Sequence, residues 1–385
     1  MRLLLRTLLL VLPLLLAVGA GAVRADGKAY LAAADAAAVR GDLDRAIALY
    51  GKAIAATALP RPARALAYAD RANAYAAQGR FDVAMADYAS ALDLAPDLVA
   101  ARLARGRLYE EGGLYDKAIA DYTAGIASQP KEPALYNARA RAYFEAGVFD
   151  RALADFNLAI KLDPVDADLY DQRGLVFYNR SDIDRAFADF SVALQILPDD
   201  AEAHRHRGVV YDARGDFAHA IVDYDQAIRL APDNIFAYGN RGRSRYLSGQ
   251  FAAAAADFAQ VAASQAADVY NLLWLHLAHL RAGQAGAGDM AEAAKRLDLA
   301  AWPGPIARLF LGQIDLDKLR SAARTNDARS RIAHACDLGF YVGELKLAQG
   351  AREEARALFA DAVVRCPKTW TEHVGAVTEL KRLGS

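Results

Sequence analysis

Residues 65–98 read ALAYADRANAYAAQGRFDVAMADYASALDLAPDL, and residues 99–132 read VAARLARGRLYEEGGLYDKAIADYTAGIASQPKE. The same register continues without an inserted residue through six copies, which begin at Ala65, Val99, Pro133, Ala167, Ala201 and Ile235. A period of 34 residues is typical of stacked helix-turn-helix units, each of which needs its neighbours to bury its apolar side. The sequence therefore predicts an all-α solenoid, and it argues against a catalytic function.

Small and aromatic residues recur at fixed positions of the repeat. Position 8 is Gly or Ala, position 20 is Ala, position 24 is aromatic, and position 11 is aromatic except for Arg245. Small residues let two helix axes approach, and the rings fill the space beside them. Position 15 is Gly except for Ser181, which predicts a left-handed cap at the end of the first helix. A Pro near the end of most copies stops the second helix.

This pattern resembles the tetratricopeptide repeat over residues 65–268, and the resemblance implies a right-handed superhelical solenoid. Residues 26–60 fit a degenerate capping unit, in which Gly41, Ala46, Tyr50 and Ala53 occupy repeat positions. After residue 268 the strict period fails, so we expect an irregular helical segment over 269–335. The pattern returns in residues 336–385, which predicts a final hairpin followed by a capping helix.

Position 7 is always Arg and position 23 is always Asp. Both lie equally far from the turn at position 15, so in an antiparallel hairpin they should sit side by side as structural ion pairs. The spacing leaves open whether each Arg pairs within its own repeat or with the next. An alternative is a basic stripe for an anionic polymer, but one acid is supplied per Arg, which disfavours it. The members of this ladder are Arg71, Arg105, Arg139, Arg173, Arg207, Arg241, Asp87, Asp121, Asp155, Asp189, Asp223 and Asp257.

The N-terminus has the order of a secretory signal. Arg2 and Arg6 precede an apolar run, and small residues follow up to Ala25, so residues 1–25 are predicted to be a signal peptide cleaved near Ala25. An uncleaved inner-membrane anchor is the alternative. Removing this segment leaves 43 basic against 47 acidic residues, and this balance argues against nucleic acid as a partner. We therefore expect a periplasmic protein that is not inserted in a membrane.

Cys336 and Cys366 are the only cysteines. In an exported protein two cysteines favour one disulfide, and their midpoint lies beside the turn residue Gly350. We therefore predict a bridge across the last hairpin. Two reduced, buried thiols are the alternative.

The chain carries few candidates for chemistry. His276 and His279 are three apart on a predicted helix, but no third metal ligand is evident. The sequence has no phosphate-binding glycine loop, nucleophile elbow or zinc-protease motif. We predict a protein that is not an enzyme and has no cofactor or metal.

The tetratricopeptide resemblance implies that positions 2, 5, 9 and 12 of each first helix line a concave wall. We call these the concave positions. Their mixture of Arg, aromatic and amide side chains suits a protein or peptide partner, although an ordinary solvated face is the simpler alternative. The candidate binding residues are Asn73, Arg107, Glu110, Asn137, Arg141, Phe144, Asp171, Tyr178, Arg205, Asp212, Phe236, Arg243 and Tyr246.

The C-terminal part resembles the NlpI-type periplasmic repeat lipoproteins. The resemblance rests on LWLHLAHL, on FLG at 310–312, on FYVGELKLAQG from Phe340 and on EHVGAVTEL from Glu372. It implies an adaptor that brings a protease and cell-wall hydrolases together, with a homodimer as one form. This chain lacks the lipid-anchor cysteine of that family. A scaffold in a polysaccharide-export or outer-membrane assembly complex is an alternative. A carbohydrate-binding or catalytic pocket near Trp302 is another.

Overall fold

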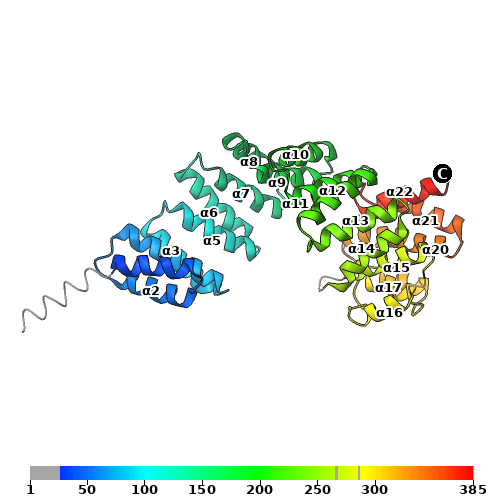
Figure 1. Ribbon diagram of the computed structural model, residues 1–385, viewed down its shortest axis with the longest axis horizontal. Coiled ribbons are helices and arrows are strands. Elements are labelled where there is room, and N and C mark those ends of the chain that lie inside the picture. The colour runs from blue at the N-terminus through cyan, green and yellow to red at the C-terminus, as the bar shows by residue number, and fades with distance from the viewer. Residues whose placement is uncertain (1–26, 265–267, 285–286, 385) are drawn as a thin grey trace, which may run out of the picture. The chain divides into compact units, whose positions relative to one another are not determined.

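The computed structural model of the chain describes residues 27–264, 268–284 and 287–384. The predicted signal peptide lies outside these residues. Every regular element in the described part is a helix (Figure 1). Among the described residues, no helix has both the length and the apolar character needed to cross a lipid bilayer. The chain divides into two compact units, of which unit 1 ends at Pro164 and unit 2 begins at Val165.

Unit 1 is a series of helical hairpins. A helix over 27–39 and α2 form the first hairpin, which occupies the predicted capping unit. The later hairpins are three 34-residue repeats, each with a first and a second helix. The helices are α2 (Leu43–Ala55), α3 (Arg61–Ala77), α4 (Phe81–Leu94), α5 (Val99–Glu111), α6 (Tyr115–Ser128), α7 (Pro133–Glu145) and α8 (Phe149–Leu162).

Close packing explains the small residues of the repeat. A Cβ atom added to Gly106 would lie 2.3 Å from the Tyr122 ring, so position 8 must stay small where position 24 carries a ring. The turn at position 15 needs a left-handed backbone. Gly79 has a φ of 72° there, and Ser181 adopts a φ of 60° at the same place without being glycine.

The Arg and Asp ladder is formed within single repeats in both units. Each ladder Arg donates two hydrogen bonds to the Asp sixteen residues later, at distances of 2.6–3.0 Å. All six Asp side chains are buried. This geometry gives each buried carboxylate a bidentate partner, which is the strongest form of such a pair.

Unit 2 begins with three further repeats and continues into the irregular segment and the C-terminal hairpin. The helices are α9 (Ala167–Asn179), α10 (Ile183–Ile196), α11 (Ala201–Ala213), α12 (Phe217–Leu230), α13 (Ile235–Leu247), α14 (Phe251–Ala263), α15 (Val269–Arg281), α16 (Ala287–Ala294), α17 (Gly304–Phe310), α18 (Leu316–Ala322), α19 (Ala328–Asp337), the π-helical turn η1 (Leu338–Val342), α20 (Gly343–Ala348), α21 (Arg352–Arg365) and α22 (Thr371–Arg382).

The irregular segment has its own core. Trp274 of α15 is buried among the rings of Tyr246, Phe258 and Phe340. Its short helix α16 ends at Ala294. The Asp315 side chain caps α18 by accepting the backbone N–H of Lys318.

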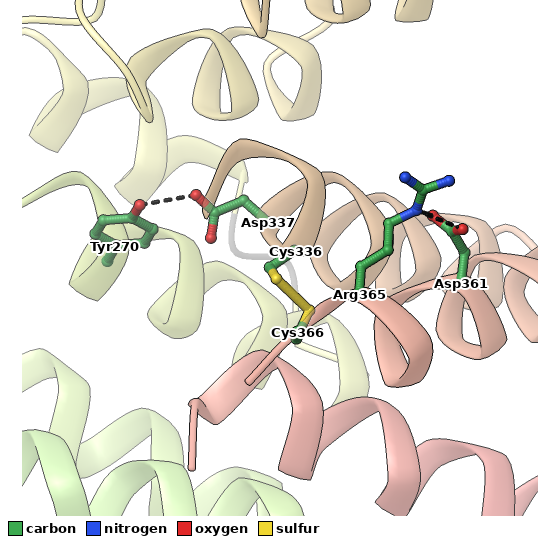
Figure 2. Close-up of a disulfide and its surroundings, with 6 residues drawn as sticks. All are labelled: Tyr270, Cys336, Asp337, Asp361, Arg365 and Cys366. Carbon is green, nitrogen blue, oxygen red and sulfur yellow. Dashed lines mark hydrogen bonds and ion pairs between the residues drawn. A yellow bond between two sulfur atoms is a disulfide. The ribbon is translucent and has the colours of Figure 1, made fainter. Parts of the chain in front are cut away.

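The predicted disulfide joins Cys336 of α19 to Cys366 at the end of α21, with their Cα atoms 5.4 Å apart (Figure 2). It fixes the point where the chain leaves α21 and crosses toward α22. Both cysteines are buried, and they hold the final hairpin against the helix that precedes it.

Candidate functional site

In unit 1 the candidate binding residues at the concave positions are exposed or half-buried. Arg107 of α5, Arg141 of α7 and Asn73 of α3 are exposed, and Asn137 and Phe144 are half-buried. Because the helices that carry these residues are consecutive first helices of the repeats, their side chains recur along one face. This arrangement offers cationic, amide and aromatic groups to a partner.

One acid lies among the cations of unit 1. Burial raises the pKa of Glu110, and the positive charges of Arg141 and Arg107 oppose that increase. The hydroxyl of Tyr88 donates a hydrogen bond to the side-chain oxygen of Asn73 and holds that amide in place. The unit 1 face therefore combines exposed arginines with positioned polar groups.

In unit 2 several concave positions are not available to a partner, which corrects the expectation from the repeat register. Asp171 is buried and bonded to the His206 ring at 2.8 Å. Tyr246 is fully buried, and its hydroxyl donates to Glu344 at 2.7 Å. Arg205 donates to Glu202 of its own helix at 2.6 Å.

The chain itself covers this part of unit 2. The backbone between α21 and α22 reaches the concave position Tyr178, whose hydroxyl donates to the carbonyl of Thr369 at 3.4 Å. Helix α22 contacts α11, and Val374 lies beside Tyr178 and Asp212 at a small cavity. The C-terminal segment therefore occupies the place that the repeat register offers to a ligand.

A buried charge cluster holds α22 in position. Arg281 of α15 donates to Glu344 at 2.9 Å and to Glu379 of α22 at 3.3 Å, and both carboxylates are fully buried. Burial raises the pKa of Glu344 to about 7, with the neighbouring Glu379 adding to the effect. Arg382 bonds to Glu379 and to the carbonyl of Leu247 at the end of α13. Charged groups from α15, α20 and α22 thus meet at this point.

A cavity of about 340 Å³ remains between the last full repeat and the C-terminal elements of unit 2. This volume is at the small end of the range for ligand pockets, which is roughly 300–1,000 Å³. The lining residues come from α13, α14, α15, η1 and α22, and they include Phe236, Asn240, Arg243, Val261, Asp268, Tyr270, Asn271, Trp274, Tyr341, Thr371 and Glu372. Two predicted residues, Phe236 and Arg243, therefore lie at this cavity.

Three polar groups at this cavity stand out by their surroundings. Arg243 donates to the side chain of Asn240, and in the described part of the chain no carboxylate forms an ion pair with it. The hydroxyl of Tyr341 is buried without a hydrogen-bond partner among the described residues. Burial, together with the negative charge of Asp337, raises the pKa of Glu372 to about 7. An unsatisfied hydroxyl and two charged groups that converge on a concavity are typical of a ligand site.

Trp302 is packed and has a structural role. Its indole N–H donates to Asp337 at 2.7 Å, and its ring stacks on His334 at 4.1 Å. Asp337 also accepts the Tyr270 hydroxyl at 2.8 Å, and Figure 2 shows this bond beside the disulfide. Burial raises the pKa of Asp337, while these two hydrogen bonds oppose the shift. Asp337 therefore positions Tyr270 at the cavity, and the hydrogen bond from Trp302 holds the Asp337 carboxylate in place.

The histidine pair of the sequence finds no further ligands nearby. His276 lies edge-on against Phe310 at 5.6 Å, in the core of the irregular segment. Across the described ranges, no three His, Cys, Asp or Glu side chains are grouped so that they could hold a metal ion.

Several cavity residues were missed by sequence reasoning. Asn271, Tyr341 and Glu372 lie outside the regular repeats, so the register could not assign them to a face. The stretches FYVGELKLAQG and EHVGAVTEL contain Tyr341 and Glu372, but on the sequence alone they support only a resemblance.

Sequence profiles of the tetratricopeptide repeat family match residues 31–99, 69–133, 103–167, 137–201 and 201–234. Together they cover residues 31–234, which is more than half of the 385 residues. The chain is a tetratricopeptide repeat protein. Members of this family act as scaffolds for protein–protein interaction, and the fold is typically not catalytic.

One solved structure agrees with this fold: a tetratricopeptide repeat protein from Parabacteroides merdae is 19% identical, with a TM-score of 0.55 over 66% of this chain and 98% of its own. Two further structures are similar to shorter parts of the chain. YrrB, a TPR protein with an unusual peptide-binding site, is 23% identical over 45% of this chain and 89% of its own, with a TM-score of 0.37. The first TPR domain of Spaghetti, bound to an HSP90 peptide, is 30% identical over 30% of this chain and 93% of its own, with a TM-score of 0.30.

Proposed function

We propose that this tetratricopeptide repeat protein is an exported, non-enzymatic scaffold that binds envelope proteins or peptides at the concave positions of unit 1. The observation that carries the proposal is the exposure of Arg107 and Arg141 beside the half-buried ring of Phe144. Arginine and aromatic side chains supply most of the binding energy in protein interfaces. Charged groups that a solenoid needs only for its own fold are paired, as the ladder is.

The cellular location in this proposal comes from the sequence. The basic, apolar and small-residue order of residues 1–25 supports export, and the paired Cys336 and Cys366 suit an oxidising compartment. The similarity of the C-terminal part to the NlpI-type lipoproteins supports a role in the periplasm that recruits a protease or cell-wall hydrolases, in monomeric or dimeric form. A place in a polysaccharide-export or outer-membrane assembly complex would use the same face with another partner.

A photo-crosslinking experiment in periplasm-containing cells tests the proposal. The crosslinking amino acid replaces Phe144 at the concave positions of unit 1, or Val364, which is 85% exposed on α21 and serves as the matched control. We expect adducts with a small set of envelope proteins from position 144 that are absent from position 364. Mass spectrometry identifies them. Recovery of no envelope protein, or of the same proteins from both positions, would contradict the scaffold proposal.

The charge of the face provides a second check. Arg107→Glu combined with Arg141→Glu reverses two exposed cations, and adducts from position 144 should fall at least about tenfold if these arginines anchor the partner. The pair Arg185→Glu and Arg229→Glu is the matched control, because these side chains carry the same charge and are 60–63% exposed in unit 2.

A second candidate function is suggested by the cavity of unit 2, where Arg243, Tyr341 and Glu372 converge. A pocket with converging acids favours small-molecule recognition, whereas the packed Trp302 disfavours a carbohydrate site at that ring. This candidate does not compete with the scaffold role, since the two sites lie on different units.

A further inference from the structure

The cavity of unit 2 contains a cation, Arg243, that forms no close ion pair with any described residue, although the carboxylates of Glu372 and Asp212 attract it from a longer distance. The ladder arginines and Arg281 each bind a buried carboxylate, as expected for guanidinium groups at a packed surface. Arg243 is also withdrawn from solvent, yet its hydrogen bond goes to the neutral amide of Asn240. Its remaining N–H groups are available to an anion that enters the cavity.

The same cavity has acids without a paired cation. Glu372, in the first turn of α22, lines the cavity and forms no ion pair with any described residue. Asp268 lies at the exposed side, where one of its oxygens caps α15 by accepting the backbone N–H of Asn271. Its other oxygen remains open to a donor. The cavity therefore presents one positive and two negative groups at its wall.

Neutral groups complete the lining. The hydroxyl of Tyr341 is fully buried and lacks a partner among the described residues, so a ligand atom would satisfy a costly unpaired group. Val261, Ile235 and Trp274 supply an apolar wall on the side of α13 to α15. The lining is therefore divided between polar and apolar groups, which suits a small molecule that carries both charges and an apolar part.

We propose that this cavity binds a small zwitterion that carries a carboxylate, an ammonium group and an apolar side chain, as an α-amino acid or a short peptide does. The carboxylate pairs with Arg243 and accepts from Tyr341. The ammonium group donates to Glu372 and Asp268, and the side chain packs on Ile235 and the exposed ring of Phe236. This site is independent of the partner-binding face of unit 1.

The charge pattern disfavours other ligand classes. A dianion such as phosphate would meet Glu372 and Asp268 with only Arg243 to neutralise it. A simple cation would meet the unpaired guanidinium of Arg243. A sugar would leave all three charges unpaired. A zwitterion alone matches every charge.

Isothermal titration calorimetry on the full mature chain tests the proposal with defined probes. L-leucine, D-leucine and the dipeptide L-alanyl-L-leucine carry both charges. N-acetyl-L-leucine lacks the ammonium group, and L-leucinamide lacks the carboxylate. We expect saturable one-site binding of at least one zwitterion, and binding about tenfold weaker or more for both blocked compounds. Preference for leucine over the dipeptide would assign a free amino acid, and the reverse would assign a peptide.

Three substitutions locate the site. Arg243→Gln and Glu372→Gln should each weaken zwitterion binding about tenfold or more, because each removes one charged partner. Tyr341→Phe removes a hydroxyl that the folded chain leaves unpaired, so it should reduce affinity several-fold while leaving the melting temperature equal or higher. Arg141→Gln in unit 1 is the matched control and should bind like the unaltered chain.

The outcomes are distinct. No heat with any zwitterion up to about 10 mM, a range that covers even millimolar affinity, would overturn the proposal. Equal binding of L-leucinamide or N-acetyl-L-leucine would overturn the charge assignment, and unchanged affinity in Arg243→Gln with a normal melting temperature would overturn the location. None of these results bears on the crosslinks from position 144, so failure here and failure of the scaffold proposal remain separate.

Discussion

Units 1 and 2 share one repeat register, but their concave positions have different surroundings. In unit 1, Arg107 and Arg141 are exposed, whereas in unit 2 Asp171 and Tyr246 are buried and Tyr178 contacts Thr369. The ladder is the same in both units. A repeat sequence thus determines how each hairpin packs internally, while the exposure of its concave side depends on the segments C-terminal to the repeats.

The largest loss of stability should come from substitutions in the Arg and Asp ladder, and the loss should be similar in the two units. Arg71→Ala in unit 1 and Arg173→Ala in unit 2 each leave a buried carboxylate, Asp87 or Asp189, without its bidentate partner. Breaking a buried pair in this way costs about 3–5 kcal/mol. Chemical denaturation followed by circular dichroism measures the loss.

Arg185→Ala is the control for this prediction, because its pair with Asp182 is exposed and should contribute about 1 kcal/mol or less. An unchanged denaturation midpoint in Arg173→Ala would contradict the structural role of the ladder. A large loss in only one unit would show that the ladder is not equivalent in the two.

Removal of the disulfide should lower the stability of unit 2 and leave the stability of unit 1 unchanged. Replacing Cys336 and Cys366 by Ala opens a loop of 30 residues, which the chain-entropy estimate values at about 3–4 kcal/mol. All three tryptophans lie in unit 2, so their fluorescence reports its unfolding selectively. We expect the fluorescence transition to move to lower denaturant, while the ladder-dependent transition of unit 1 stays in place.

Alkylation of the denatured, unreduced protein is the accompanying measurement. Two labelled thiols per chain would show that the bridge does not form. An equal loss of stability in both units would contradict the assignment of the bridge to unit 2 alone.

The pH dependence should also differ between the units. Burial raises the pKa of Glu372 from 4.5 to about 7. The folded form therefore holds this proton more tightly than the unfolded form, so its stabilising effect is complete below about pH 4.5 and is lost as the pH rises through 7. The shift corresponds to about 3 kcal/mol. Because the pKa of Glu344 is also raised to about 7, Glu372→Gln should make the tryptophan-monitored profile less steep in this range, and the contribution of Glu344 should remain.

The titration of Glu372 should also change the affinity of the cavity for the zwitterion. Arg243 and Asp268 line the same cavity, with Tyr270 and Tyr341, while Asp337 lies behind Tyr270. The ligand ammonium requires the ionised form of Glu372, so the affinity for the zwitterion should rise as the pH passes from about 6 to about 8. An affinity that falls over this range would contradict the assigned orientation of the ligand.

The sequence predicts which residues pair locally because they lie symmetrically about a hairpin turn, but it leaves open whether each Arg binds the Asp of its own repeat or of the next, and the structure shows the former. Arg173 and Asp189 are equidistant from the turn at Ser181, and Cys336 and Cys366 are nearly so from Gly350. These contacts span at most 30 residues, so the repeat period contains the information needed to place them. The resulting fold, a tetratricopeptide solenoid, is determined by the same period.

The covered concave side could not be predicted in the same way. Tyr178 meets Thr369 across 191 residues, and Tyr246 meets Glu344 across 98, and no periodic pattern relates such distant segments. One signal was present in the sequence. Position 11 of the last repeat is Arg245 instead of an aromatic residue, and it pairs with Asp257 at 2.8 Å while Tyr246 enters the core of unit 2.

The smallest effect on stability should come from substitutions at the exposed concave positions of unit 1. They therefore test most directly whether these positions serve binding and not folding. Arg107→Glu and Arg141→Glu alter exposed side chains, but they also remove the positive charges near Glu110, so the free energy of unfolding should fall by about 1 kcal/mol or less per substitution. The fold depends little on these two cations. A partner that uses them as anchors would no longer bind the substituted chain. A large change in stability would mean that they serve the packing of unit 1, as the ladder does. Unchanged stability with a loss of crosslinks from position 144 would place their role in binding, since only an interaction outside the chain would then depend on them.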